Sequence, residues 1–191
     1  MGLFGRLRTK DGRVDPHSYL HAEAMKVVPA AQQARSQWMS QLEQAYPTPG
    51  DAFAATLPAL LEVEKLRGET RALSEIATLE SRGGKTDPQL AALIEQTRRA
   101  VEWDWSTLSA SCGMLLFHAD ENAAAVEGAG TEAGRLEAAR HASDQFEEWW
   151  RDNRSSLVPP GVPTARDAYA TGLEQANVAL GGAFEATAGG F

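Results

Sequence analysis

Residues 87–126 read DPQLAALIEQTRRAVEWDWSTLSASCGMLLFHADENAAAV, and this stretch decides the fold class. It opens with Asp87 and Pro88, a helix-start signal, since aspartate can cap a helix and proline fits its first position. At 100° per residue, the residues of core type fall within one arc of a single long helix. They are Leu90, Ile94, Thr97, Val101, Trp105, Leu108, Cys112, Leu115 and Ala119. The pattern predicts a helix that packs in a bundle, with Cys112 as a small core residue.

The second half of this predicted helix is apolar on nearly all sides. Trp103, Met114 and Phe117 project from roughly the opposite side to the core arc, whereas the first half carries Gln96 and Arg99 on that side. A helix that is hydrophobic all round is covered on more than one side. We expect the cover to come from the chain's own helices, from a second copy of the chain, or from a foreign partner or ligand.

The rest of the chain also favours helices. Good helix formers dominate the composition, β-branched residues are few, and no alternating run predicts a strand. Helices are predicted at about 15–44, 51–81, 87–126, 131–153 and 164–187, with proline and glycine between them. Pro29 is expected to kink or split the first helix, and Gly68 to mark a bend or break in the second. The predicted fold is all-α, an antiparallel helical bundle of four to five helices.

The breaks divide the chain into four segments. Residues 1–14 hold three glycines and four basic residues, and are expected to form a short, disordered, flexible basic tail. Residues 15–156 are expected to form a four-helix core, followed by a proline-rich linker at 157–163. Residues 164–191 are expected to form a C-terminal fifth helix that packs on the core or on another chain. Gly181 and Gly182 lower the helix propensity of this segment, so the helix needs to pack against another part of the protein. The side of the third predicted helix that carries Trp103 and Phe117 is one candidate for that packing surface.

Charge and cysteine content limit the partners and the compartment. The formal net charge is −8, and an acidic surface repels phosphate backbones, so nucleic-acid binding is not expected. Cys112 is the only cysteine, which is compatible with a reducing cytosol. No signal-peptide pattern and no apolar run of membrane-spanning length occur. We expect a cytoplasmic protein, and the alanine-rich, lysine-poor composition suggests a high-GC bacterial source.

Histidines and carboxylates do not predict a metal site. On the fourth predicted helix, Glu137, His141 and Asp144 lie opposite the expected inner side and face solvent. That inner side is formed by Leu136, Ala139, Ser143, Phe146 and Trp150. His17 and His21 stand one turn apart near a helix start, where a protonated histidine is mildly unfavourable. No phosphate-binding loop or nucleophile motif occurs. We therefore predict no catalytic residue, no metal ligand and no cofactor.

The candidate binding residues surround the two tryptophans of the third predicted helix. They are Trp103, Asp104, Trp105, Met114, Phe117 and Trp149. Asp104 lies near the edge of the core arc, where it either bonds to a donor on a neighbouring helix or anchors a ligand in an aromatic pocket. Trp149 lies on the flank of its helix, where it either covers a helix–helix joint or anchors a partner.

Three functions fit these features. The first is a non-catalytic helical-bundle protein that acts through protein–protein interaction or self-association, as a homo-oligomer in the latter case. The second is a small-molecule or metal-binding bundle, an enzyme included, with a pocket near Trp103, Asp104, Trp105 and His118. The third is a peripheral membrane adaptor that uses the basic tail, residues 1–14. The lack of a local catalytic motif favours the first of these functions, the non-catalytic bundle protein.

Overall fold

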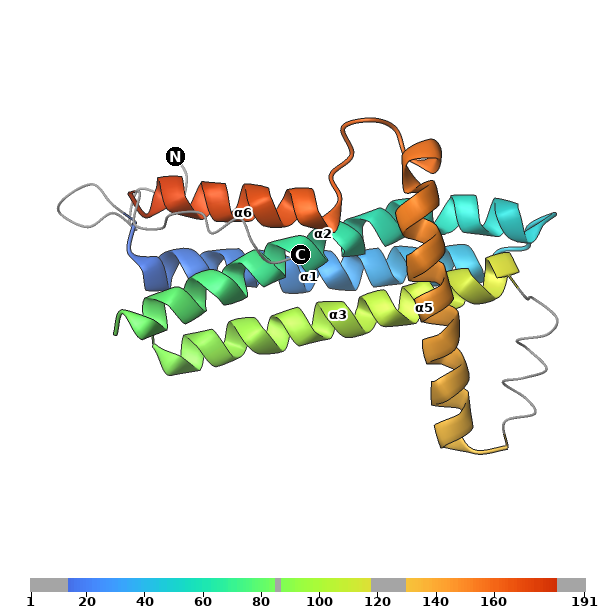
Figure 1. Ribbon diagram of the computed structural model, residues 1–191, viewed down its shortest axis with the longest axis horizontal. Coiled ribbons are helices and arrows are strands. Elements are labelled where there is room, and N and C mark those ends of the chain that lie inside the picture. Colours follow the sequence, from blue (N-terminus) through green and yellow to red (C-terminus); the bar gives the residue numbers. More distant parts are fainter. Residues whose placement is uncertain (1–13, 85–86, 118–129, 182–191) are drawn as a thin grey trace. The chain divides into compact units, whose positions relative to one another are not determined.

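A computed structural model of the chain describes residues 14–84, 87–117 and 130–181. Within them the secondary-structure elements are five α-helices (Figure 1). They are α1 (Pro16–Leu42), α2 (Pro49–Arg82), α3 (Pro88–Phe117), α5 (Glu132–Leu157) and α6 (Ala165–Ala179). The all-α bundle predicted from the sequence is confirmed. The basic tail up to residue 13, and the predicted helical ends at 118–126 and 182–187, lie outside the described residues.

Local sequence sets where the helices begin. Asp15 accepts a backbone N–H of the first turn of α1 at 2.9 Å. Thr131 caps α5 in the same way at 3.2 Å. Thr164 and Asp167 form a reciprocal capping box at the start of α6, with Asp167 in place of the usual glutamate. These side chains satisfy backbone donors that have no partner inside the helix.

Neither Pro29 nor Gly68 splits its helix. Helix α1 continues through Pro29, and α2 continues through Gly68. Val27 and Ala31 are buried on either side of Pro29, so packing of the same helix face offsets a proline penalty of about 3 kcal/mol. Gly68 allows a close approach of α6, because a Cβ atom there would lie 2.0 Å from the carbonyl oxygen of Ala165.

The helices form two compact units, each of which is described by itself. Unit 1 contains the described parts of residues 1–32, 64–101 and 163–191, and unit 2 contains residues 33–63 and the described parts of 102–162. Each unit contains part of α1, of α2 and of α3, together with one further helix. That helix is α6 in unit 1 and α5 in unit 2.

In unit 1, α6 runs beside the second half of α2 (Figure 1). Small residues bring the two helices together, because a Cβ atom at Gly172 would lie only 2.9 Å from Cβ of Ala72. The hydroxyl of Tyr169 donates a hydrogen bond to Glu75. Larger apolar side chains from α1, α2 and α3 fill the rest of the interior: Leu20, Val27, Leu66, Leu73, Ile76, Leu90, Ile94 and Val101.

In unit 2, α5 crosses the neighbouring helices (Figure 1), and aromatic rings fill the joint. Phe146 stacks on Trp150, with 5.7 Å between ring centroids and 20° between planes. Phe53 of α2 meets both rings edge-on. At Gly113 a Cβ atom would lie 2.3 Å from the carbonyl oxygen of Ala142, so α3 and α5 touch through their backbones.

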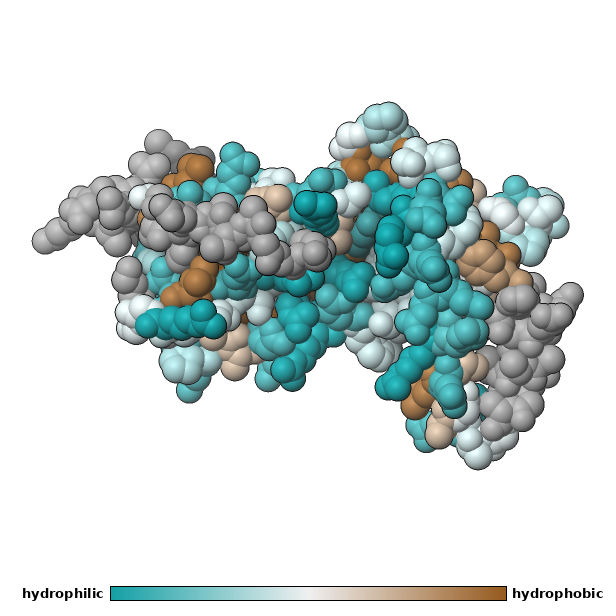
Figure 2. Space-filling model, in the orientation of Figure 1, coloured by the Kyte–Doolittle hydropathy of each residue, from teal (hydrophilic) through white to brown (hydrophobic). Residues whose placement is uncertain are grey.

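The inner side predicted for α5 is wrong at its first turns. Ser143, Phe146 and Trp150 are buried as expected, but Leu136 is 56% exposed. No residue from 132 to 141 is buried, because this end of α5 extends beyond the helices that it crosses (Figure 1). Figure 2 shows a small apolar area near the same end of the helix, among mostly hydrophilic neighbours.

Candidate interaction site around Trp103

Three consecutive side chains of α3 face three different environments. Trp103 is 63% exposed, whereas Asp104 and Trp105 are buried. Asp104 contacts α1 and Trp105 contacts α5. This divergence follows from the 100° rotation between successive helical residues. The structure therefore does not bring Trp103, Asp104 and Trp105 together in one pocket, and His118 lies outside the described residues.

Asp104 is bonded to a donor on a neighbouring helix, the first of the two roles expected for it. Nη1 of Arg35 lies 3.4 Å from Oδ1 of Asp104. The carboxylate is buried, while the arginine side chain is half exposed. Burial raises the pKa of Asp104, and the charge and hydrogen bond of Arg35 act in the opposite direction. The pair joins α1 to α3 directly beside Trp103.

Trp105 holds α3 against α5. Its indole Nε1–H donates to Oε1 of Glu147 at 2.5 Å. One turn further along α3, the hydroxyl groups of Ser109 and Ser143 are 2.5 Å apart and share a buried hydrogen bond. A buried indole usually finds such an acceptor. Trp105 therefore has a packing role at the helix crossing.

Phe117 packs against α5 within unit 2. Its ring centroid lies 5.7 Å from that of Trp149, edge to face. Trp149 also meets Phe53 edge-on at 5.9 Å. Trp149 thus covers a helix–helix joint, the first of its two expected roles. Met114 and Phe117 are each half-buried.

Of the six candidate binding residues, Trp103 is the exposed one. Arg35 and Met39 stand one turn apart on α1, and so share a side of that helix. Met39 is exposed, and Arg35 pairs with Asp104, which directly follows Trp103 in α3. We call Arg35, Met39 and Trp103 the Trp103 surface. It combines an indole, a thioether and a guanidinium, which are side-chain types enriched in protein interfaces.

Sequence reasoning missed the partners that hold these side chains. Arg35 and Asp104 are 69 residues apart, and Trp105 and Glu147 are 42 apart, so no local spacing signals either pair. Trp38 of α1 is a buried core residue. Its indole Nε1 is buried and has no hydrogen-bond partner in the part of the chain that the structure describes.

Cys112 has the inert core role that the sequence predicted. The residue is fully buried in unit 2. Burial raises the pKa of its thiol to about 12, and a hydrogen bond with Thr56 only partly offsets this. Since the thiolate is the reactive form of cysteine, the buried thiol is unreactive at neutral pH.

Among the described residues, no group of three or more His, Cys, Asp or Glu side chains is placed to hold a metal ion. None of the helices in the same residues has both the length and the apolar character to cross a membrane. Comparison of the chain with protein-family models, with curated protein sequences and with solved structures found no match.

Proposed function

We propose that this chain is a non-catalytic helical-bundle protein that acts through protein–protein contact, and that the Trp103 surface forms the contact. The exposure of Trp103 carries the proposal, because a large indole left in water loses favourable burial. Tryptophan and arginine dominate the binding energy of protein interfaces, and the half-exposed Arg35 pairs with Asp104, the residue that follows Trp103.

The first occupant to test is a second copy of the chain. The Trp103 surface has both an apolar part and a cation, and the chain carries an excess of acidic residues that a cation can meet. The proposed location is the cytoplasm of a bacterium, supported by the lone, fully buried cysteine. The proposal includes no cofactor.

Sedimentation velocity over a wide range of protein concentrations tests the proposal. We expect the wild-type chain to self-associate, and Trp103→Ser to weaken the association at least about tenfold, as loss of a central interface tryptophan does. Val178→Ser is the matched control, since Val178 is 76% exposed on α6 and is not part of the Trp103 surface. It should associate like the wild type.

Two results would count against this function. A wild-type chain that stays monomeric at every concentration excludes the second copy as occupant. A photo-crosslinking side chain at position 103 would then have to capture a partner whose binding Trp103→Ser abolishes and Val178→Ser spares. If neither self-association nor such a partner is found, protein–protein contact through Trp103 is wrong.

A further inference from the structure

A groove lined mostly by polar and charged residues lies along α2 in unit 1 and shares no residue with the Trp103 surface. Its volume is about 780 Å³, which is within the range of small-molecule sites. It is lined by Arg71, Ser74, Glu75, Thr78, Leu79, Arg82, Glu95 and Arg98. Leu79 is the one apolar residue of this lining, so the groove suits a polar ligand.

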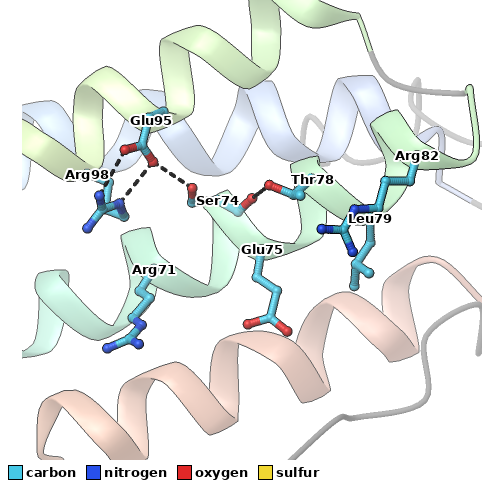
Figure 3. A pocket seen from close by; sticks show the side chains of 8 residues that line it. All are labelled: Arg71, Ser74, Glu75, Thr78, Leu79, Arg82, Glu95 and Arg98. Carbon is cyan, nitrogen blue, oxygen red and sulfur yellow. Dashed lines mark hydrogen bonds and ion pairs between the residues drawn. The ribbon is translucent and has the colours of Figure 1, made fainter. Parts of the chain in front are cut away.

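Helical spacing aligns the charges of the groove. Arg71, Glu75 and Arg82 stand at positions i, i+4 and i+11 of α2, and therefore on one side of that helix. Helix α3 contributes Glu95 and Arg98. Figure 3 shows Arg71, Arg98 and Glu95 at one end of the groove, Arg82 at the other, and Glu75 between them.

The carboxylate of Glu95 is already bound by the protein. Arg98 donates to both of its oxygens, from Nε at 2.9 Å and from Nη2 at 2.8 Å. Arg99 donates from Nε at 2.9 Å, and the Ser74 hydroxyl donates at 2.8 Å (Figure 3 draws the Arg98 and Ser74 bonds). The pKa of Glu95 is lowered to about 2, and the hydrogen bonds from Arg98 are the largest cause of this shift. Its negative charge is therefore neutralised within the groove wall.

The carboxylate of Glu75 is also engaged, through α6. It accepts the hydroxyl hydrogen of Tyr169. The guanidinium of Arg71 lies over the same tyrosine ring, 5.9 Å from its centroid. Both side chains are thus held at the edge where α6 packs on α2.

Arg82 differs from the other charged residues of the lining. It is exposed, and it makes no hydrogen bond or ion pair with another residue of the described ranges. Three arginines against two glutamates leave the lining with one excess positive charge, in a chain whose net charge is −8. Guanidinium groups bind carboxylate and phosphate through paired N–H donors.

We propose that this groove binds a small molecule with phosphate or carboxylate groups, and that Arg82 makes the main contact with the anion. Arg71 supplies a second guanidinium toward the opposite end, so a ligand with more than one anionic group is favoured. This site is independent of the proposed function, because it shares no residue with the Trp103 surface.

Isothermal titration calorimetry of the full chain, at physiological salt, tests the site with inorganic triphosphate and with citrate as probes. We expect at least one probe to bind, and Arg82→Gln to weaken its binding about tenfold, or about 1.4 kcal/mol. Arg140→Gln is the matched control, since it removes the same charge from an exposed position on α5. Arg82→Lys keeps the charge and should lose less affinity than Arg82→Gln.

The two probes separate phosphate from carboxylate recognition, and binding of either supports the site. Three outcomes would overturn the proposal. Neither probe binds the wild-type chain, or Arg82→Gln and Arg140→Gln weaken binding equally, or a glutamate-rich peptide binds while both small anions fail. Circular dichroism of Arg82→Gln confirms that the fold is intact, which is expected for a substitution at an exposed side chain.

Discussion

A hydrogen atom in place of a side chain at position 113 allows α5 to lie against α3. Any larger residue would place its Cβ atom 2.3 Å from the carbonyl oxygen of Ala142. That oxygen belongs to the backbone of a helix and cannot move away alone. At position 104 a carboxylate is buried, and its charge is paired with Arg35, whose side chain is half exposed. Both positions predict measurable changes in stability.

We expect Gly113→Ala to lower the free energy of unfolding by about 1–3 kcal/mol, the usual cost of overpacking. The clash outweighs the gain of about 1 kcal/mol in helix propensity that alanine brings. Urea unfolding measures the change. Gly50→Ala is the control, since its new Cβ atom would meet its nearest neighbour at an ordinary 3.6 Å. Equal stability of the two variants would show that α3 and α5 are not in backbone contact.

Asp104 should make stability depend on pH. Its folded-state pKa is raised above the ordinary value, mainly by burial, so the folded chain holds its proton more tightly than the unfolded chain does. The ionised carboxylate therefore costs stability above the folded pKa, and this cost disappears as the pH falls toward the ordinary pKa. Asp104→Asn removes the titration.

We expect the stability of Asp104→Asn, relative to the wild type, to improve as the pH rises from the acidic range to neutral. Urea unfolding of both proteins at a series of pH values measures this difference. A relative stability that instead falls with rising pH would mean that attraction to Arg35 outweighs the cost of burial. Ser106→Ala, at an exposed position on α3, removes no titratable group and is the control, so its stability relative to the wild type should not change with pH.

The helices differ in how much of their length is buried against the rest of the protein. Helix α6 has 15 residues and buries mainly small side chains, so its attachment depends on close approach to α2. Helix α5 has 26 residues but is buried only from Ala142 onward. Short isolated helices are marginal in water, and α6 therefore owes its stability to its packing on α2.

Gly68→Ala should loosen α6. Its new Cβ atom would lie 2.0 Å from the carbonyl oxygen of Ala165, at the first turn of α6. Hydrogen exchange measured by mass spectrometry should show faster exchange of the α6 amides, while the core of α5 is less affected. Val178→Ala, on the exposed side of α6, should leave the exchange unchanged. Unchanged exchange in Gly68→Ala would contradict the close contact.

Over the entire chain, three helices supply residues to both compact units. Helices α1, α2 and α3 each continue from one unit into the other without a break. All five tryptophans belong to unit 2, so their fluorescence reports that unit, whereas circular dichroism reports the helices of both. Because a helix that unfolds in one unit loses support for its continuation in the other, the two units should unfold together.

We therefore expect thermal unfolding followed by tryptophan fluorescence and by circular dichroism to give the same midpoint. Gly68→Ala, which lies in unit 1, should lower the fluorescence midpoint of unit 2 as well. Separate transitions, or a fluorescence midpoint that Gly68→Ala leaves unchanged, would show that the units are independent. Helix continuity would then not couple their stability.

Much of the fold could be read from local patterns. Helix periodicity and capping residues such as Thr131 and Thr164 act within a few residues, so they predicted the helical class and the helix starts correctly. The core role of Trp105 and Cys112 followed from the same periodicity. The exposed groove on α2 had no such signal, because it combines side chains from two helices.

Contacts between distant residues were decided by the tertiary structure alone. Spacing along the chain carries no information about which helix faces Asp104, which covers Phe117 or how far α5 extends beyond its neighbours. Packing also overruled the local penalties at Pro29 and Gly68, since burial of a whole helix face outweighs one unfavourable residue. Local free energies set where the helices form, whereas the larger free energy of burial decides which sides meet and leaves Trp103 in water.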